Sequence, residues 1–196
     1  MFKISKGNTK LGKLFNVNLP AITTCEPNVP CASHCYACKG TYYFTNVKKR
    51  YQENLETFAN SPDLAKNDIL SQLPITGNHY CRLHSSGDFV NMDYLDMIVE
   101  IVERRPNIQF LAFTKKYSMI NKYLEINNSF PDNLKIVFSY WENYPMPNIH
   151  FLPIAVVAEF SSPLQLQEGF PCTGKCTECY HCWDMQGNDM VVFHKH

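Results

Sequence analysis

Eight of the nine cysteines in this chain of 196 residues fall into two short groups. The first cysteine group is Cys25, Cys31, Cys35 and Cys38, and the second cysteine group is Cys172, Cys176, Cys179 and Cys182. Thiolates held this close together are the ligands that proteins offer to zinc and to iron–sulfur clusters. The first residues lack the apolar core of a secretory signal, so we expect a reducing cytoplasm, where cysteines stay thiols. The pattern predicts two metal centres, with Cys81 outside both as a buried structural thiol.

The spacing of the first cysteine group favours an open iron–sulfur cluster. Cys31, Cys35 and Cys38 have the spacing C-x3-C-x2-C, and Tyr36 directly follows the middle cysteine. Three thiolates can bind three irons of a 4Fe–4S cluster and leave the fourth iron free for another ligand. A structural zinc site would use all four thiolates, but zinc sites usually pair two short knuckles across a longer gap, which this spacing does not match.

The second cysteine group predicts a closed centre. Its four thiolates lie in one short loop, in which Gly174 can supply an unusual backbone angle. Consecutive C-x2-C steps resemble ferredoxin-type ligation of a 4Fe–4S cluster, so we expect a second, auxiliary cluster here. Zinc is the nearer rival at this group, because four thiolates complete its tetrahedral coordination. His181 is expected beside the metal rather than on it.

The elements that must position these groups alternate between short apolar strands and amphipathic helices from residue 75 onward. Such alternation is typical of βα units around a largely parallel sheet. We expect strands at 79–84, 108–114, 135–140 and 154–160, and helices at 42–58, 63–73, 94–102 and 119–126. About four units are too few for a complete eightfold barrel, which takes about 250 residues. The predicted fold is α/β, a partial (open) βα barrel over residues 1–165, with residues 166–196 as a cysteine-rich, metal-binding segment of the same domain.

Composition and motifs exclude several classes of function. Eighteen basic and eighteen acidic side chains leave the chain formally neutral, so nucleic acid is not indicated as a partner. No stretch reaches the roughly 18–20 apolar residues of a membrane span, so we expect no membrane partner and a cytoplasmic protein. The chain also lacks the nucleophile-elbow, phosphate-loop and dinucleotide-binding motifs.

The motif of Cys31, Cys35 and Cys38 with Tyr36 resembles that of the radical S-adenosylmethionine (radical SAM) family. That family has a full or partial βα barrel with the cysteine loop after the first strand, a place that residues 14–21 can fill here. The resemblance implies that Tyr36 lies near the adenine of S-adenosylmethionine. Further cofactor-binding positions implied by the resemblance and by the edge of the sheet are Ser85, Ser86, Gly87 and Asp88, followed by Thr114 and Lys115. Without the cysteines, an ordinary turn would explain Gly87 and Asp88.

A narrower resemblance is to small phage-encoded proteins related to radical SAM enzymes, which would place this protein in a host cytoplasm. The matching residues are Cys25, Cys31, Cys35-Tyr36-Ala37, Gly40 and the run from Cys172 to Cys182-Trp183. Two sets of three cysteines can therefore hold the first cluster. They are Cys25, Cys31 and Cys35, or Cys31, Cys35 and Cys38; the motif favours the second set.

The function that the resemblance implies is reductive cleavage of S-adenosylmethionine at an open 4Fe–4S cluster, which starts radical chemistry on a substrate that the sequence does not identify. An external electron donor is then a required partner. The competing hypothesis is a non-catalytic binding protein that zinc or clusters stabilise at both ends.

Overall fold

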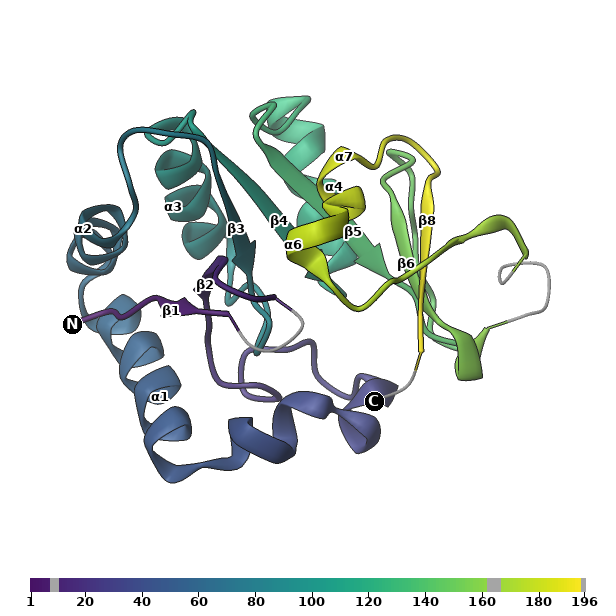
Figure 1. The fold of residues 1–196 in the computed structure, drawn as a ribbon, viewed down its shortest axis with the longest axis horizontal. Helices are drawn as coiled ribbons and strands as arrows, with labels where there is room; N and C mark the ends of the chain where they lie inside the picture. Colours follow the sequence, from purple (N-terminus) through teal and green to yellow (C-terminus); the bar gives the residue numbers. More distant parts are fainter. Residues whose placement is uncertain (8–10, 162–166, 195–196) are drawn as a thin grey trace.

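The computed structural model describes residues 1–7, 11–161 and 167–194, and it is built around one sheet of eight strands (Figure 1). The strand order is β1-β2-β3-β4-β5-β6-β8-β7. Strand β1 runs antiparallel to β2, and every other neighbouring pair is parallel. The chain is therefore a mixed α/β protein whose mostly parallel sheet is not closed, since β1 and β7 lie at opposite ends of the strand order.

The strands are β1 (Ser5–Lys6), β2 (Phe15–Val17), β3 (His79–Leu83), β4 (Ile108–Thr114), β5 (Leu134–Ser139), β6 (Ile154–Val157), β7 (Phe170–Pro171) and β8 (Met190–Phe193). The α-helices are α1 (Thr45–Asn60), α2 (Pro62–Gln72), α3 (Met92–Glu103), α4 (Tyr117–Asn127), and the single turns α6 (Cys176–Cys179) and α7 (His181–Asp184). Short 3-10 helices are η1 (Pro30–His34), η2 (Tyr36–Cys38), η3 (Gly40–Tyr43) and η4 (Ala158–Phe160).

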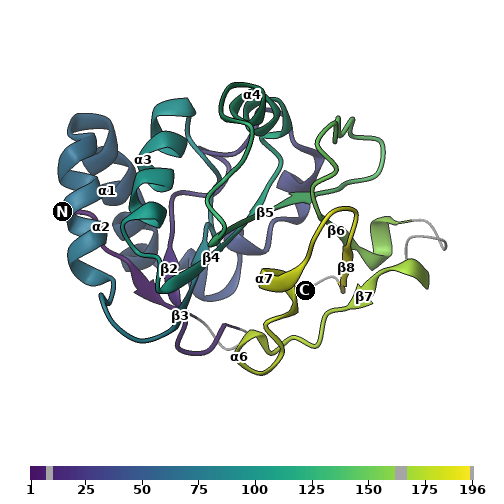
Figure 2. The ribbon, with the colours of Figure 1, turned by 90° about the horizontal axis from the view of Figure 1, so that it is seen from above.

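Each central strand serves two hydrophobic cores because its side chains alternate between the two faces of the sheet. In β4, Phe110 and Ala112 pack into the larger core, together with buried side chains of α1–α4. Leu111 and Phe113 point to the opposite face and belong to a smaller core with Trp183. Figure 2 shows the same division, with α1–α4 on one side of the sheet and α6 and α7 on the other. The second cysteine group thus covers the face that the long helices leave free.

Helix α3 illustrates why the predicted helices form. The Asn91 side chain caps its first turn by accepting a hydrogen bond of 2.9 Å from the backbone N–H of Tyr94. Buried Tyr94, Leu95 and Ile98 follow at three- and four-residue spacing and face the larger core.

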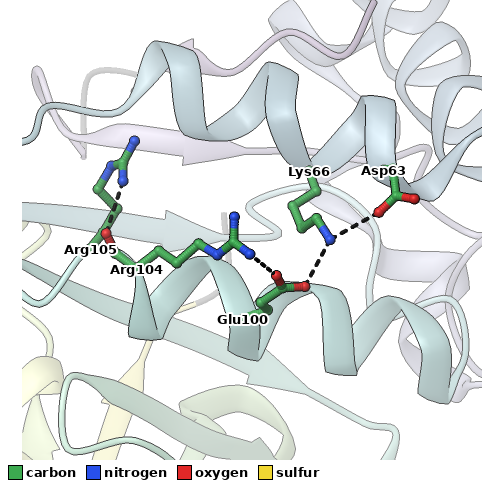
Figure 3. Close-up of polar contacts among 5 residues, drawn as sticks. All are labelled: Asp63, Lys66, Glu100, Arg104 and Arg105. Carbon is green, nitrogen blue, oxygen red and sulfur yellow. Dashed lines mark hydrogen bonds and ion pairs between the residues drawn. The ribbon is translucent and has the colours of Figure 1, made fainter.

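A cluster of charged side chains ties α2 to α3 on the outer surface (Figure 3). The ammonium of Lys66 lies 2.9 Å from both Asp63 and Glu100, and Glu100 also pairs with Arg104. Arg105 donates hydrogen bonds to the backbone carbonyls of Arg104 and Leu70. These contacts hold the helical layer together far from the cysteines.

The structure confirms the predicted strands at 79–84, 108–114 and 135–140 to within one residue, and the helices at 63–73, 94–102 and 119–126 in position and type. The first predicted helix begins at Thr45 instead of residue 42, because 3-10 turns occupy residues 40–43. The expected strand 14–21 is limited to β2. Strand 154–160 was wrong at its end, since η4 takes its last three residues, and it is not the final strand, since β7 and β8 follow.

Within the described residues, no helix has both the length and the apolar character that crossing a bilayer requires. The expected boundary between residues 165 and 166 lies outside the described residues.

Candidate functional site

A cavity of about 620 Å³ lies at the carboxyl ends of the parallel strands, and we call it the thiol-lined cavity. Cys25, Cys31 and Cys35 line it, whereas Cys38 does not belong to its lining. The remaining predicted site residues in its wall are Tyr36, Ser85, Ser86, Gly87, Asp88, Thr114 and Lys115. The structure therefore brings every predicted cofactor-binding residue together with three cysteines of the first group. The volume is typical of sites that bind small molecules, which span roughly 300–1,000 Å³.

A turn follows β3, and we call it the β3 turn; it consists of Ser85, Ser86, Gly87 and Asp88. Residues of β2 and of the segment directly after β2 hold this turn by hydrogen bonds. Asn16 and Ser85 exchange two hydrogen bonds, of 2.7 and 3.0 Å. The backbone N–H of Ser86 donates to the Asn18 side chain at 3.0 Å, and the Ser86 hydroxyl donates to the Leu19 carbonyl at 2.9 Å. Both serine hydroxyls thus hold the turn in place.

Gly87 allows the segment before Cys25 to dock on the β3 turn. Its φ is +82°, and a Cβ atom at this position would lie 2.6 Å from the Thr24 hydroxyl oxygen and 2.9 Å from the Leu19 carbonyl oxygen. The Thr24 hydroxyl also accepts a hydrogen bond of 3.0 Å from the backbone N–H of Asp88. Because Cys25 directly follows Thr24, this contact places the Cys25 thiol against the turn.

Asp88 joins the end of β3 to the end of β4. Its carboxylate accepts hydrogen bonds from the Thr114 hydroxyl at 2.6 Å and from the backbone N–H of Lys115 at 3.1 Å. Burial raises the pKa of Asp88 above its usual value, and these hydrogen bonds oppose the shift. The Lys115 ammonium donates to the Ser139 hydroxyl at 2.6 Å, so it also reaches the end of β5. Burial lowers the pKa of Lys115, while the nearby thiols and Asp88 favour its charged form.

Tyr36 fastens the first cysteine group to the β3 turn. Its hydroxyl donates a hydrogen bond of 2.7 Å to the carbonyl oxygen of Ser85. The residue as a whole is 44% exposed, but burial of its hydroxyl raises the pKa of that group. Tyr36 therefore has a positioning role that does not depend on a bound adenine.

The thiols of the cavity are held in a partly desolvated setting. Burial raises the pKa of Cys25 to about 12, with the Asp88 charge as the next cause. Burial also raises the pKa of Cys35 to about 11, followed by the effect of Cys38. Because a metal takes thiolates, loading the site must release these protons.

Three aromatic side chains, which we call the aromatic wall, face the same cavity and were not predicted: His34, Trp141 and Phe160. The rings of Trp141 and Phe160 stack at 4.3 Å, and His34 lies 5.1 Å from Phe160. The Lys115 ammonium sits 5.7 Å from the Trp141 ring. The one sequence signal was that Trp141 follows a predicted strand closely, at the edge where ligands bind.

The second cysteine group surrounds a much smaller space, of about 30 Å³. Cys176 and Cys179 bound α6, Cys182 lies in α7, and Cys172 follows β7. Trp183 anchors this segment, since it is buried and its ring N–H donates to the Gln109 carbonyl of β4 at 3.0 Å. Burial raises the pKa of Cys182 to about 12, while the positive charge of Arg82 opposes the shift.

His181 adds a nitrogen donor to this second site. Its ring stacks on Phe170 at 3.9 Å, and its Nε2 atom is buried without a hydrogen-bond partner among the described residues. An unpaired buried nitrogen beside four thiols is costly unless a further group satisfies it. The lining therefore offers four thiols and one unpaired imidazole nitrogen, which are donor types that thiolate-bound metal centres use.

A family model describes 158 residues of the chain, positions 2–159, as Gene product 88. The chain belongs to the Gene product 88 family. No curated protein and no solved structure was found to match it. The part shared with the Gene product 88 family contains the first cysteine group and most of the thiol-lined cavity, whereas the second cysteine group lies beyond the matched residues.

In this Gene product 88 protein, no three histidine, cysteine or acidic side chains of the described residues are gathered as a site for a metal ion. Three cysteines of the first group, Cys25, Cys31 and Cys35, line the thiol-lined cavity. Thiols are the side chains from which iron–sulfur clusters take their ligands, each on a different iron.

Proposed function

We propose that this protein is a radical SAM-type iron–sulfur enzyme, with the thiol-lined cavity as its active site at the open end of a partial βα barrel. One observation carries the proposal: Cys25, Cys31 and Cys35 line the same cavity as the β3 turn and Lys115. The type of reaction comes from the resemblance of Cys25, Cys31 and Cys35-Tyr36-Ala37 to the small phage-encoded proteins related to radical SAM enzymes. A 4Fe–4S cluster bound here supplies reductive cleavage of S-adenosylmethionine, with the electron coming from an external donor.

We assign the cluster to Cys25, Cys31 and Cys35 rather than to Cys31, Cys35 and Cys38. The first three thiols line the cavity, and Cys25 is fixed against the β3 turn through Thr24. Cys38 lies outside the lining and closes η2. It remains close enough to Cys35 to affect the pKa of that thiol.

The other side chains of the cavity bind and orient. The Lys115 ammonium can hold a carboxylate, and the Asp88 carboxylate and the backbone of Gly87 can receive an amino group. The aromatic wall can pack against a planar ring and exclude water. Tyr36, through its bond to Ser85, keeps the cysteine loop at a fixed distance from these groups.

The second cysteine group is proposed to hold the auxiliary 4Fe–4S cluster. Its four cysteines line a space of about 30 Å³, much smaller than the thiol-lined cavity. We therefore expect iron to load the second site more slowly than the first.

The test is anaerobic reconstitution with iron and sulfide, followed by incubation with dithionite and S-adenosylmethionine. We expect about four irons and four sulfides per occupied cluster, broad visible absorbance, and release of 5′-deoxyadenosine. Cys31→Ala and Cys35→Ala should each abolish that release and the faster phase of iron uptake. Cys81→Ala is the matched control, since it removes a buried thiol that lies outside both groups.

A colourless protein that binds zinc at both groups would support the non-catalytic hypothesis and end this proposal. Unchanged release of 5′-deoxyadenosine in Cys31→Ala and Cys35→Ala would remove the role assigned to the first group.

A further inference from the structure

The two cysteine sites share a wall. Arg82, in the middle of β3, lines both the thiol-lined cavity and the small space inside the second cysteine group. Phe193 of β8 lines both as well. The neighbours of Arg82, Cys81 and Leu83, are buried in the larger core, so Arg82 points to the opposite face of the sheet. Along that face, the wall between the two sites contains one arginine.

The guanidinium of Arg82 is held in a defined place. It lies 4.0 Å from the centre of the Phe113 ring, and its Nε donates to the Leu83 carbonyl at 3.4 Å. Phe113 in turn packs edge-on against Phe193, with ring centres 5.4 Å apart. In the described part of the chain, no carboxylate lies within ion-pair distance of Arg82.

A half-buried arginine without a carboxylate partner needs a negative charge from another source, because burying an unpaired charge costs free energy. On the side of the second group, Arg82 lies close enough to Cys182 for its charge to oppose the rise in the pKa of that thiol. On the other side it shares the thiol-lined cavity with the Asp88 carboxylate and with three thiols of the first group, which become thiolates once they hold metal. Nearby charge and hydrogen bonds to sulfur are known determinants of the potential and stability of thiolate-bound centres. One guanidinium between two anionic centres also screens their mutual repulsion.

We infer that Arg82 is a positioning residue that stabilises the metal-loaded state of both cysteine groups and thereby couples them. The inference rests on the proposed function, because it requires metal at both groups. The inference goes beyond the proposed function because it assigns the energetic coupling between the two metal centres to one side chain. Since coupling is reciprocal, emptying the second group should change the first centre, and the size of that change should depend on Arg82.

The test compares Arg82→Gln and Arg82→Lys with Arg50→Gln, which removes the same charge from an exposed position on α1 outside both linings. Each protein is reconstituted anaerobically with iron and sulfide. The midpoint potential of the first centre is measured by redox titration, and the rate of metal release from the second group is measured with a chelator. The titration is repeated in a Cys179→Ser/Cys182→Ser background, which empties the second group.

We expect Arg82→Gln to lower the reduced fraction of the first centre about tenfold at fixed potential, a shift of about 59 mV for one electron. It should also speed metal release from the second group about tenfold. Arg82→Lys should restore part of both effects, and Arg50→Gln should leave both unchanged. Emptying the second group should shift the potential by a different amount in Arg82→Gln than in the unmodified chain.

The inference is overturned if Arg82→Gln and Arg82→Lys leave either readout unchanged, or if Arg50→Gln reproduces both effects. Arg82→Lys keeps the charge but loses the planar guanidinium, so it should show smaller shifts in the same direction, and these decide the question where Gln impairs folding. Failure of the proposed function looks different: in that case the unmodified chain takes up no iron and sulfide at the first group.

Discussion

The two cysteine groups use the same side chain in opposite structural settings. The first group lies along the segment after β2 and the 3-10 turns η1 and η2, beside a cavity of about 620 Å³. The second group lies along the segment after β7 and the single turns α6 and α7, around about 30 Å³. The first is fixed by polar contacts with the β3 turn, such as Tyr36 to Ser85. The second is fixed by apolar packing of Trp183 on the sheet. Neighbouring elements, more than cysteine spacing, therefore decide whether a thiol site is open to a ligand.

The largest expected effect is a difference in iron content between variants of two cysteines of the first group. Cys25→Ala should remove the first centre completely and leave the second, so that about half of the iron is lost from a chain that holds two clusters. Cys38→Ala, the matched control, should keep both centres, because its thiol lies outside the cavity lining. Iron and sulfide analysis of both variants measures this. Iron loss in Cys38→Ala with retention in Cys25→Ala would reverse our assignment.

The two tryptophans of the chain provide the next comparison, since one belongs to each site. Trp183→Ala should lower the free energy of unfolding by about 3–5 kcal/mol, because it leaves a cavity beneath the second group and removes the hydrogen bond to Gln109. Trp141→Ala, at the half-buried aromatic wall, should cost clearly less stability and should weaken binding of S-adenosylmethionine. Denaturant unfolding and calorimetry measure the two effects. Equal losses of stability would contradict the contrast drawn between an open and a packed site.

Two glycines with similar backbone angles give a finer comparison. Gly87→Ala combines a φ of +82° with contacts under 3 Å to Thr24 and Leu19. Gly174 has a φ of +77°, but no atom of residues 1–7, 11–161 or 167–194 lies within 4 Å of a Cβ added there. We expect Gly87→Ala to destabilise the protein by about 1–3 kcal/mol more than Gly174→Ala does. Thermal unfolding of both variants measures the difference, and equal effects would mean that the docking of Thr24 is not tight.

The smallest expected effect is a dependence on pH that belongs to the open site. Burial, followed by the charge of Arg82, lowers the pKa of His84 from 6.5 to about 3, and His84 lines the thiol-lined cavity. Between these two pKa values His84 is protonated in the unfolded chain and neutral in the folded chain. The contribution of neutral His84 to the free energy of unfolding is therefore complete above pH 6.5 and decreases as the pH falls towards 3.

Between neutral pH and pH 5 the loss from His84 should reach about 2 kcal/mol. His84→Asn should remove this loss, since asparagine tolerates the positive φ of 58° at this position. His79→Asn, at the start of β3 and outside the cavity lining, is the matched histidine control. Denaturant unfolding across this range measures the pH dependence, and identical pH curves for His84→Asn and the unmodified chain would refute the assignment.

Most of the fold could be predicted from the sequence where the elements are long. Strand β4 and helix α3 have clear periods of two and of three to four residues, and both were predicted nearly to the residue. Strands β1, β7 and β8 were missed because segments of two to four residues carry no period, and their pairing with distant strands creates them. Residues 42 and 43 were predicted as the start of a helix, but they belong to the 3-10 helix η3.

The residues of the candidate site also fall into those that the sequence could predict and those that it could not. Its cysteines and the β3 turn could be found because each lies within a few consecutive residues. Arg82, Trp141 and Phe160 could not, because three separate elements bring them to the cavity. The choice between Cys25 and Cys38 also needed the fold, since both have suitable spacing and one of them alone faces the cavity.

The position of β8 has a consequence for how the protein is made. This strand lies between β6 and β7, although β6 is complete more than 30 residues earlier. During synthesis, β6 must therefore remain an unpaired edge until residues 190–193 have left the ribosome, and such an edge is prone to pair with other chains. Fast translation of the last segment, or a chaperone that covers β6, should then raise the yield of folded protein more than any change in the helical layer.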